Sequence, residues 1–242
     1  MPSHTETGHA KNVAYFHDLI AFCIGYGGTY NPTRPDLSVG DLQTLETSAI
    51  NALADVLSKK TTFNNTVNDR MIVFADLRSL CTRLMNALQA TAASNELIKD
   101  AKTYNKKIQG VRAGKLETPT DPNAPVPVHI STSQQSYDQL IQHFAGIIEV
   151  LHSEPTYAPN ETELQIPTLM TKKTELIAKN DAVSTAHTDV SNARITRDNI
   201  LYHALTGLVP IAGDVKMYIK SVFGNASAQY NQVKGIPFRI IK

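Results

Sequence analysis

The sequence predicts an all-α fold, and three observations support this prediction. Proline is absent between Pro35 and Pro119 and again between Pro167 and Pro210, which leaves room for long helices. The second observation is an internal repeat, which the next paragraph describes. The third is a series of apolar residues three, four or seven positions apart over much of the first half: Leu42, Leu45, Ala49, Ala52, Val56, Phe63, Val67, Phe74, Leu77, Cys81, Leu84 and Leu88. This spacing places one apolar stripe along a helix, and no comparable strand alternation is seen.

The second half of the chain repeats the first half at a constant offset. Thr29-Tyr30-x-Pro32 aligns with Thr156-Tyr157-x-Pro159. The same offset pairs further identical residues: Leu37 with Leu164, Leu42 with Leu169, Thr44 with Thr171, Thr47 with Thr174, Ile50 with Ile177, Val56 with Val183, Thr61 with Thr188, Asn65 with Asn192 and Arg70 with Arg197. A shared helical pattern explains matched Leu and Ile but not the matched Thr-Tyr-x-Pro, so we infer a duplication.

We therefore predict a tandem duplication of an up-and-down four-helix bundle. The alternative is an elongated bundle with long continuous helices that resemble a coiled coil. The first bundle repeat is expected over residues 1–112 and the second over residues 131–242. Residues 113–130 contain four prolines, from Pro119 to Pro127, and predict a semi-rigid linker between the repeats.

Four helices are expected in the first repeat, at residues 9–26, 39–60, 63–91 and 94–109. The glycines of Gly25-Tyr-Gly-Gly28 end the first helix. Ser38 can cap the second helix, and Asp41 lies in its first turn, where a carboxylate is favourable. Gly110 follows the fourth helix, at the position where glycine commonly ends a helix.

The second repeat is expected to contain helices at residues 136–153, 167–184, 190–223 and 226–233. Pro167 suits the first turn of its helix, where the missing N–H has no partner to lose. Pro210 lies inside the third helix and should kink or split it.

The junction between the second and third helices of each repeat, at residues 60–65 and 187–192, leaves two possibilities. The apolar spacing runs through it without a phase break, which favours one continuous helix. The polar run Thr61-Thr62-Phe-Asn64-Asn65 favours a turn, because Thr and Asn are poor helix formers. A turn lets four helices of similar length close into a compact bundle, and we favour it.

Composition and charge exclude several classes of protein. The chain carries 23 Lys+Arg and 22 Asp+Glu, a net charge of +1, whereas a general nucleic-acid binder is usually strongly basic. Two cysteines cannot form a disulfide scaffold. No apolar run reaches the about 18 residues of a membrane span, and the polar start from Met1 to Lys11 lacks a secretory signal. We therefore expect a cytoplasmic protein, with non-classical export left open.

Two Glu-x-x-His pairs match the short pattern of metal centres in helical bundles: Glu6 with His9, and Glu149 with His152. Glu6 lies in a polar tail and Glu149 near a helix end, so we interpret both pairs as surface residues. His143 does not share a helix face with His152. We predict no catalytic residue, no cofactor-binding residue and no metal ligand. Cys23 and Cys81 occupy apolar positions and are interpreted as buried small hydrophobic residues.

Four further features each allow two interpretations. The basic stretch of Lys99, Lys102, Lys106, Lys107, Arg112 and Lys115 is interpreted as a solvated helix face rather than an anion-binding patch. The apolar residues 201–223 are interpreted as a kinked core helix rather than a membrane-inserting hairpin. Tyr30 and Tyr157 are expected to lock the crossover that follows the first helix, rather than to form a binding surface. The apolar tail at residues 236–241 could dock on its own bundle or on a neighbouring subunit.

Three motifs of the second repeat carry a resemblance to a known family: Ser191-Asn-Ala-Arg-x-x-Arg-x-x-x-Leu-Tyr202, Asp214-Val-Lys-x-Tyr-x-Lys-Ser-Val-Phe-Gly224 and Gln229-Tyr-x-Gln-Val-x-Gly-Ile236. The chain resembles a family of tandem helical-bundle proteins of Bacteroidota for which no activity is established. The resemblance covers residues 130–241 well and the first repeat more loosely. It implies a helical fold and a bacterial source, and it assigns no functional residues.

The sequence thus predicts a non-enzymatic structural or interaction protein that assembles with copies of itself into an oligomer or filament. We expect no nucleic acid, membrane or small-molecule substrate among its partners, and no cofactor. The two alternatives are a membrane-acting helical protein of the pore-forming kind and a helical bundle that binds a ligand or a metal ion.

Overall fold

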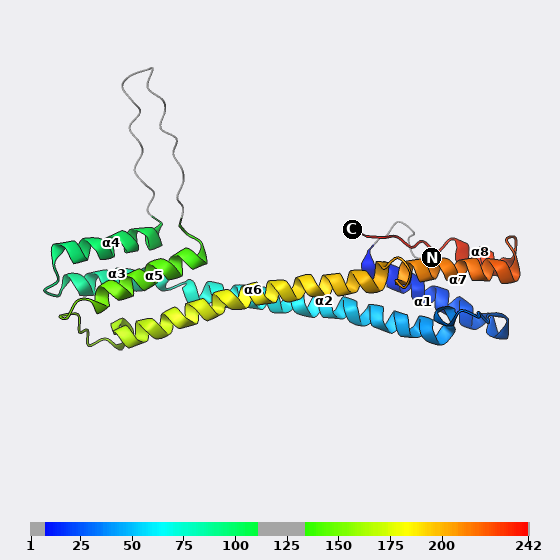
Figure 1. Cartoon of the computed structure of the whole chain (residues 1–242), viewed down its shortest axis with the longest axis horizontal. Helices are drawn as coiled ribbons and strands as arrows, with labels where there is room; N and C mark the ends of the chain where they lie inside the picture. Colours follow the sequence, from blue (N-terminus) through cyan, green and yellow to red (C-terminus); the bar gives the residue numbers. More distant parts are fainter. Residues whose placement is uncertain (1–7, 111–133, 242) are drawn as a thin grey trace, which may run out of the picture. The chain divides into compact units, whose positions relative to one another are not determined.

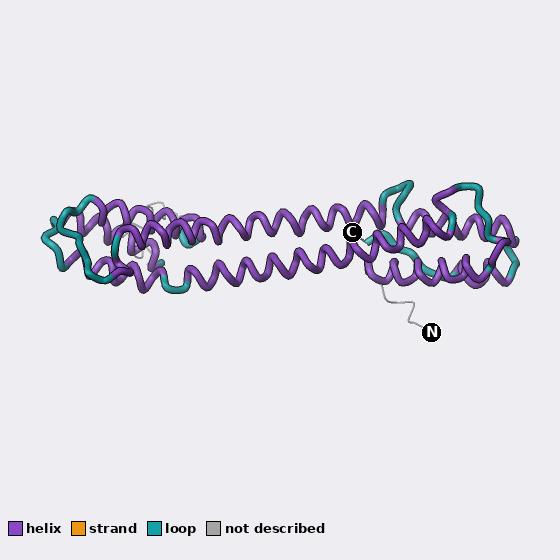
Figure 2. Tube along the Cα trace, turned by 90° about the horizontal axis from the view of Figure 1, so that it is seen from below, coloured by secondary structure: helices purple, strands orange, loops and turns teal. Residues whose placement is uncertain are grey.

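The computed structural model describes residues 8–110 and 134–241, and these residues form helices and loops without a β-strand (Figure 2). The prediction of an all-α fold is confirmed. The α-helices are α1 (His9–Gly25), α2 (Val39–Phe74), α3 (Leu77–Gln89), α4 (Asn95–Gln109), α5 (Tyr137–His152), α6 (Ile166–Tyr202), α7 (Leu208–Phe223) and α8 (Ala228–Lys234). Three short 3-10 helices are η1 (Gly27–Thr29), η2 (Pro35–Leu37) and η3 (Thr162–Leu164).

The predicted helix caps are present. The side chain of Ser38 accepts a hydrogen bond from the Asp41 N–H, at 3.2 Å. Ser94 caps α4 in the same way, and Gly110 follows that helix with a left-handed φ of 72°. A right-handed helix cannot continue through a residue with that φ. Glycine adopts the conformation without strain, so Gly110 allows the helix to end there.

The predicted turn at residues 60–65 is wrong, because α2 and α6 each run through their junction without a break. The apolar spacing that crosses the junction therefore outweighed the polar residues. Thr61 and Thr62 donate their hydroxyl hydrogens to the carbonyls of Leu57 and Ser58, at 3.0 and 3.2 Å. Their polar groups are thus satisfied within the helix instead of competing with it. The first repeat turns later, after Phe74.

Pro210 splits the third helix of the second repeat, as predicted. Helix α6 ends at Tyr202, and α7 begins at Leu208 with Gly207 as its N-cap. Pro210 therefore lies in the first turn of α7, where its missing N–H breaks no helical bond. Gly207 is required by a close approach, because an added Cβ would lie 2.5 Å from the backbone nitrogen of His203.

The chain folds into two compact units that do not follow the predicted domain boundaries. Unit 1 consists of Met1–Asn64 and Ala186–Lys242, and unit 2 consists of Asn65–Thr185. We expected the bundles at residues 1–112 and 131–242, but each unit combines parts of both repeats. The predicted linker, at residues 113–130, lies outside the described residues.

In unit 2, helices from the first repeat pack against helices from the second. Helix α3 contacts α4, α5 and η3, and α4 also contacts α5 (Figure 1). Helices α3 and α4 belong to the first repeat, whereas η3 and α5 belong to the second. The core contains the fully buried side chains of Leu84, Leu88, Ile108, Phe144 and Ile147.

Unit 1 has the same set of contacts with the two repeats exchanged. Helix α7 contacts α8, α1 and η2, and α1 also contacts α8. In the repeat, α1 corresponds to α5, α7 to α3, α8 to α4 and η2 to η3. Each unit is therefore closed by the first helix of one repeat packing on the third and fourth helices of the other.

Helices α2 and α6 run antiparallel where they meet in each unit. In unit 1, Lys59 Nζ lies 3.6 Å from an Asp189 carboxylate oxygen, and the rings of Phe63 and His187 are 5.8 Å apart. In unit 2, Lys179 Nζ donates to Asp69 at 2.9 Å. Pairs that lie later in α2 lie earlier in α6, as an antiparallel arrangement requires.

Candidate functional site

In each of the two Thr-Tyr-x-Pro loops, the tyrosine is buried and bonded to the main chain seven residues later. Tyr30 is buried and donates its hydroxyl hydrogen to the carbonyl of Leu37 at 2.7 Å. Tyr157 is buried and donates to the carbonyl of Leu164 at 2.9 Å. Burial raises the pKa of Tyr157 to about 12, so its hydroxyl stays a donor at neutral pH. The expectation that these tyrosines lock the crossover is confirmed.

Both cysteines are buried, as predicted. Cys23 lies in the core of unit 1 and Cys81 in the core of unit 2. Burial raises the pKa of the Cys23 thiol to about 11 and that of Cys81 to about 12. The thiolate is the reactive form, so these residues act as small hydrophobic side chains.

His143 is a polar residue whose burial the sequence did not predict. Its side chain is almost fully buried in α5, and its Nε2 has no hydrogen-bond partner among the described residues. Burial and the nearby charge of Lys107 lower its pKa, because both disfavour the imidazolium. The ring of Tyr104 lies 6.4 Å away and covers Gly146, where an added Cβ would lie 2.6 Å from that ring.

The residues of the two Glu-x-x-His pairs do not form a metal centre in the described structure. Glu149 and His152 are both exposed on α5. His9 Nδ1 lies 2.8 Å from the hydroxyl of Tyr202, while Glu6 lies outside the described residues. Within residues 8–110 and 134–241, no group of three or more His, Cys, Asp or Glu is placed to hold a metal ion.

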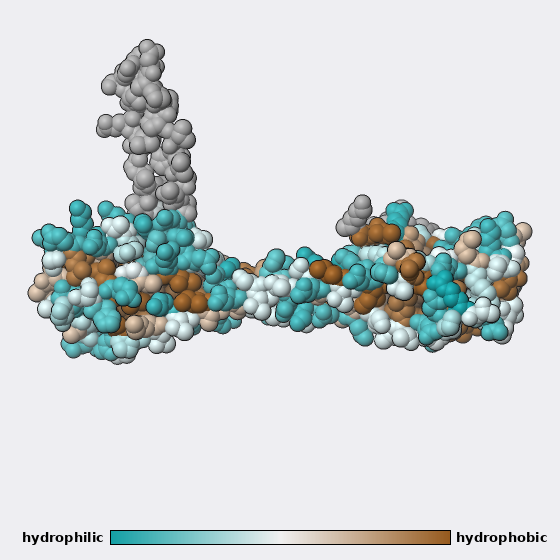
Figure 3. All heavy atoms as spheres, viewed as in Figure 1, coloured by the Kyte–Doolittle hydropathy of each residue, from teal (hydrophilic) through white to brown (hydrophobic). Residues whose placement is uncertain are grey.

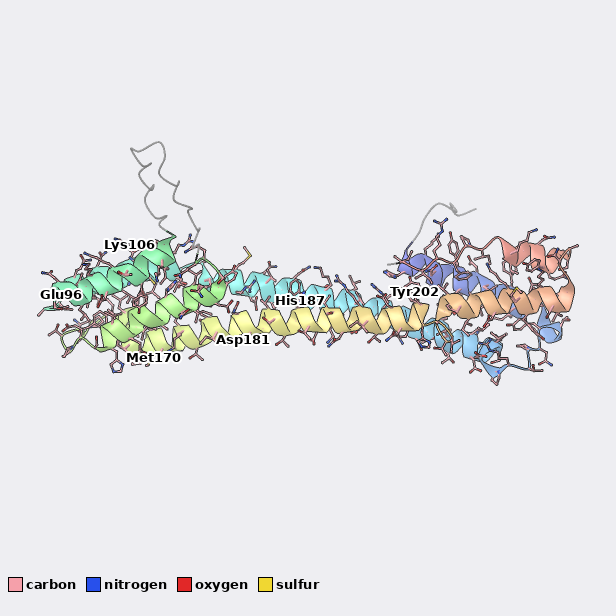
Figure 4. The ribbon with its side chains drawn as sticks, turned by 45° about the horizontal axis from the view of Figure 1, so that its top comes forward. Glu96, Lys106, Met170, Asp181, His187 and Tyr202 are labelled. Carbon is pink, nitrogen blue, oxygen red and sulfur yellow. The ribbon has the colours of Figure 1, made fainter. Side chains whose placement is uncertain are left out.

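The basic stretch of α4 is a solvent-facing surface. Lys99, Lys102, Lys106 and Lys107 are all exposed. Figure 4 labels Lys106 near the end of α4 and Glu96 near its start. Lys106 and Lys107 lie in the last turn, and Glu96 lies in the first, so each charge has the sign that the helix dipole favours. Arg112 and Lys115 lie outside the described residues.

The apolar segment at residues 201–223 supplies the core of unit 1. Leu201, Leu208, Ala212, Val215 and Ile219 are fully buried there. Among the described residues, no helix is both long enough and apolar enough to cross a membrane.

The C-terminal tail docks on its own unit. The buried side chain of Asn12 donates to the carbonyl of Arg239 at 2.7 Å and accepts from the Arg239 N–H at 3.1 Å. The ring of Phe238 meets Phe16 edge to face, at 6.5 Å between centroids. Of the two possibilities that the sequence left open, the described contacts show docking within the chain.

The matched arginines Arg70 and Arg197 each lie near the first helix of the other repeat, Arg70 near α5 and Arg197 near α1. The sequence did not predict these positions. Arg70 donates to Asn180 at 2.9 Å, and its guanidinium lies 4.0 Å from the ring centre of Tyr137. Arg197 lies near the start of α1, where its charge, after the larger effect of burial, helps to lower the pKa of His9. Their identity across the repeat was the available signal. Arg70 thus joins α2 to α5 and α6, whereas Arg197 is paired with its neighbour Asp198 at 2.8 Å.

Several large apolar side chains remain exposed, and two of them are a matched pair. Ile50 of unit 1 is 50% exposed, and its equivalent in unit 2, Ile177, is 40% exposed. Figure 3 shows apolar side chains among hydrophilic ones on the visible surface of both units.

Comparison with known proteins gives no match to a family model, to a curated protein or to a solved structure. The resemblance to the Bacteroidota family therefore stays a prediction.

Proposed function

We propose that this chain is a non-enzymatic structural or interaction protein that associates with further copies of itself. One observation carries the proposal: helix α2 exposes two large apolar side chains seven residues apart, Ile50 at 50% and Leu57 at 69%. Isolated exposed apolar residues are common on protein surfaces. Two of them on one side of one helix are accounted for by an interface. The net charge of +1 supports association, because little charge repulsion opposes it.

Sedimentation velocity from micromolar to near-millimolar protein tests this proposal. We expect the mean mass to rise with concentration, and electron microscopy of the same samples will separate closed oligomers from filaments. A chain that stays monomeric over the whole range would contradict self-association.

The two alternatives that the sequence analysis raised, a membrane-acting protein and a ligand- or metal-binding bundle, remain hypotheses. Liposome leakage tests the membrane-acting alternative, and elemental analysis of the purified protein tests the metal-binding one. The cytoplasm is the proposed location.

A further inference from the structure

Helix α2 carries a second row of residues, on its exposed side, with the spacing of a coiled-coil seam. We call these residues the outer row: Gln43, Thr47, Ile50, Ala54, Leu57 and Thr61. All six are exposed and lie in unit 1. Their steps alternate between four and three residues, as between the a and d positions of a heptad. The row is separate from the buried one, which contains Leu42, Ala49 and Ala52.

The outer row carries no charged residue and exposes two large apolar side chains. Ile50 and Leu57, at d positions, are 50% and 69% exposed. Thr47 donates its hydroxyl hydrogen to the Gln43 carbonyl at 2.9 Å, and Thr61 donates to the Leu57 carbonyl at 3.0 Å. These bonds satisfy the hydroxyls inside the helix, so the threonines contribute their methyl groups to the surface. A face that only meets water would usually carry Lys or Glu.

We propose that the outer row pairs antiparallel with the outer row of a second copy of this chain. This inference rests on the proposed function and names its contact. In antiparallel pairing, each a position faces a d position of the partner helix. Ile50 of one chain then faces Ala54 of the other, and Leu57 faces Thr47. Each layer of the seam combines a large side chain with a small one, as close packing requires.

Charges beside the outer row favour the same orientation. Antiparallel pairing brings the positions just before each a residue together across the seam, so Lys60 of one chain lies beside Glu46 of the other. Glu46 is already paired with His17 of its own chain, at 2.7 Å, and its side chain is 14% exposed, so this charge pair is a minor contribution beside the seam itself. A parallel pair would instead place Lys60 beside Asn65, without an opposite charge.

The equivalent row of α6 is interrupted by a charge. It consists of Met170, Thr174, Ile177, Asp181 and Ser184, all exposed, and Figure 4 labels Met170 and Asp181 on this helix. Asp181 stands where α2 has Ala54, and burying its carboxylate in a seam is costly. Of these two equivalent rows, only the outer row of α2 is therefore competent, and a self-complementary contact through it gives a closed dimer rather than a filament.

The length of the outer row sets the expected strength. At about 1.5 Å per residue, the row from Gln43 to Thr61 is about 27 Å long. One helix pair of that length buries less than the roughly 1,200–2,000 Å² of a stable interface. We therefore expect a reversible dimer that forms as concentration rises.

Ile50→Lys tests the contact, with Ile177→Lys as the matched control. Both positions are exposed, so neither substitution disturbs a core. In sedimentation velocity, Ile50→Lys should raise the dimer dissociation constant at least about tenfold, and Ile177→Lys should leave it unchanged. If the wild type associates and Ile50→Lys does not weaken it, the outer row is not the contact, although the proposed function stands. A monomeric wild type overturns both.

Cross-linking tests the orientation independently. Chains with Gln43→Cys are mixed with chains carrying Thr61→Cys, and a short bismaleimide is added. Antiparallel pairing predicts cross-linked pairs of the two different chains and few between two Gln43→Cys chains. The native cysteines are buried and will not compete. Efficient cross-linking of Gln43→Cys to itself would show a parallel pair and overturn the inference.

Discussion

Tyr30 and Leu37 are joined by a buried hydrogen bond, from the phenol to the main-chain carbonyl at 2.7 Å. Tyr157 makes the matching bond to Leu164 in the other unit. Tyr30→Phe keeps the ring but leaves the carbonyl unpaired, so we expect a loss of about 1–3 kcal/mol in the free energy of unfolding, measured with urea. Tyr157→Phe should cost a similar amount.

Tyr104→Phe is the control for these two variants. Its ring packs on Gly146, and its hydroxyl makes no hydrogen bond that is seen among the described residues. We expect its unfolding free energy to stay within about 0.5 kcal/mol of the wild type. A Tyr30→Phe protein as stable as this control would show that the carbonyl of Leu37 finds another donor.

Asn12 should hold the C-terminal tail. Asn12→Ala removes both hydrogen bonds to the main chain of Arg239. We expect a loss of about 1–3 kcal/mol in stability and faster trimming of the tail by carboxypeptidase. Asn86→Ala, at an exposed position of α3, is the control. Equal trimming rates for the two variants would mean that Asn12 does not retain the tail.

His143 should make the protein less stable in acid. Its pKa in the folded chain lies below its ordinary value, first because of burial and then because of Lys107. The unfolded chain takes up a proton at about pH 6.5, whereas the folded chain takes it up only at lower pH. The stability is therefore fully present above that pH and declines as the pH falls below it.

Urea unfolding between pH 8 and pH 5 measures this effect, with His143→Phe as the test variant. The variant should lose less stability over this range than the wild type. His152→Gln, at an exposed position of the same helix, should follow the wild type. Parallel pH profiles for His143→Phe and the wild type would refute the assignment.

The contacts between the repeats should hold a cut chain together. A specific protease site can be inserted within residues 113–130 and cleaved after folding. Because α5 packs on α3 and α4, and α1 packs on α7 and α8, the two fragments should co-elute in size-exclusion chromatography. They should separate only in denaturant. Fragments that separate in native buffer would indicate one independent bundle per repeat.

Local features were predictable from residue types alone. The cap at Ser94, the helix end at Gly110 and the burial of Cys23 each depend on a few neighbouring positions. The continuity of α2 was not predicted, because Thr61 and Asn65 are poor helix formers on their own. In the structure they lie on the exposed side, while Phe63 on the other side packs against α6. A tertiary partner thus overrides weak local propensity.

The candidate surface was only partly visible beforehand. The sequence shows that Ile50 and Ile177 are a matched pair, but it does not show whether they are buried or exposed. Their exposure required the structure, which buries Leu42 and Ala49 on a different side of α2. The roles of Arg70 and Asn12 were hidden for the same reason, because their partners lie far along the chain.

The sequence by itself determined that this protein is helical, and it predicted that its second half repeats the first and that Tyr30 and Tyr157 lock the crossovers. Only the tertiary structure decided which helices close each unit. An apolar stripe shows that a helix face is buried, but not against which partner. Two similar repeats offer each first helix two similar partners, and only the observed contacts show that α1 packs on α7 and α8 and that α5 packs on α3 and α4.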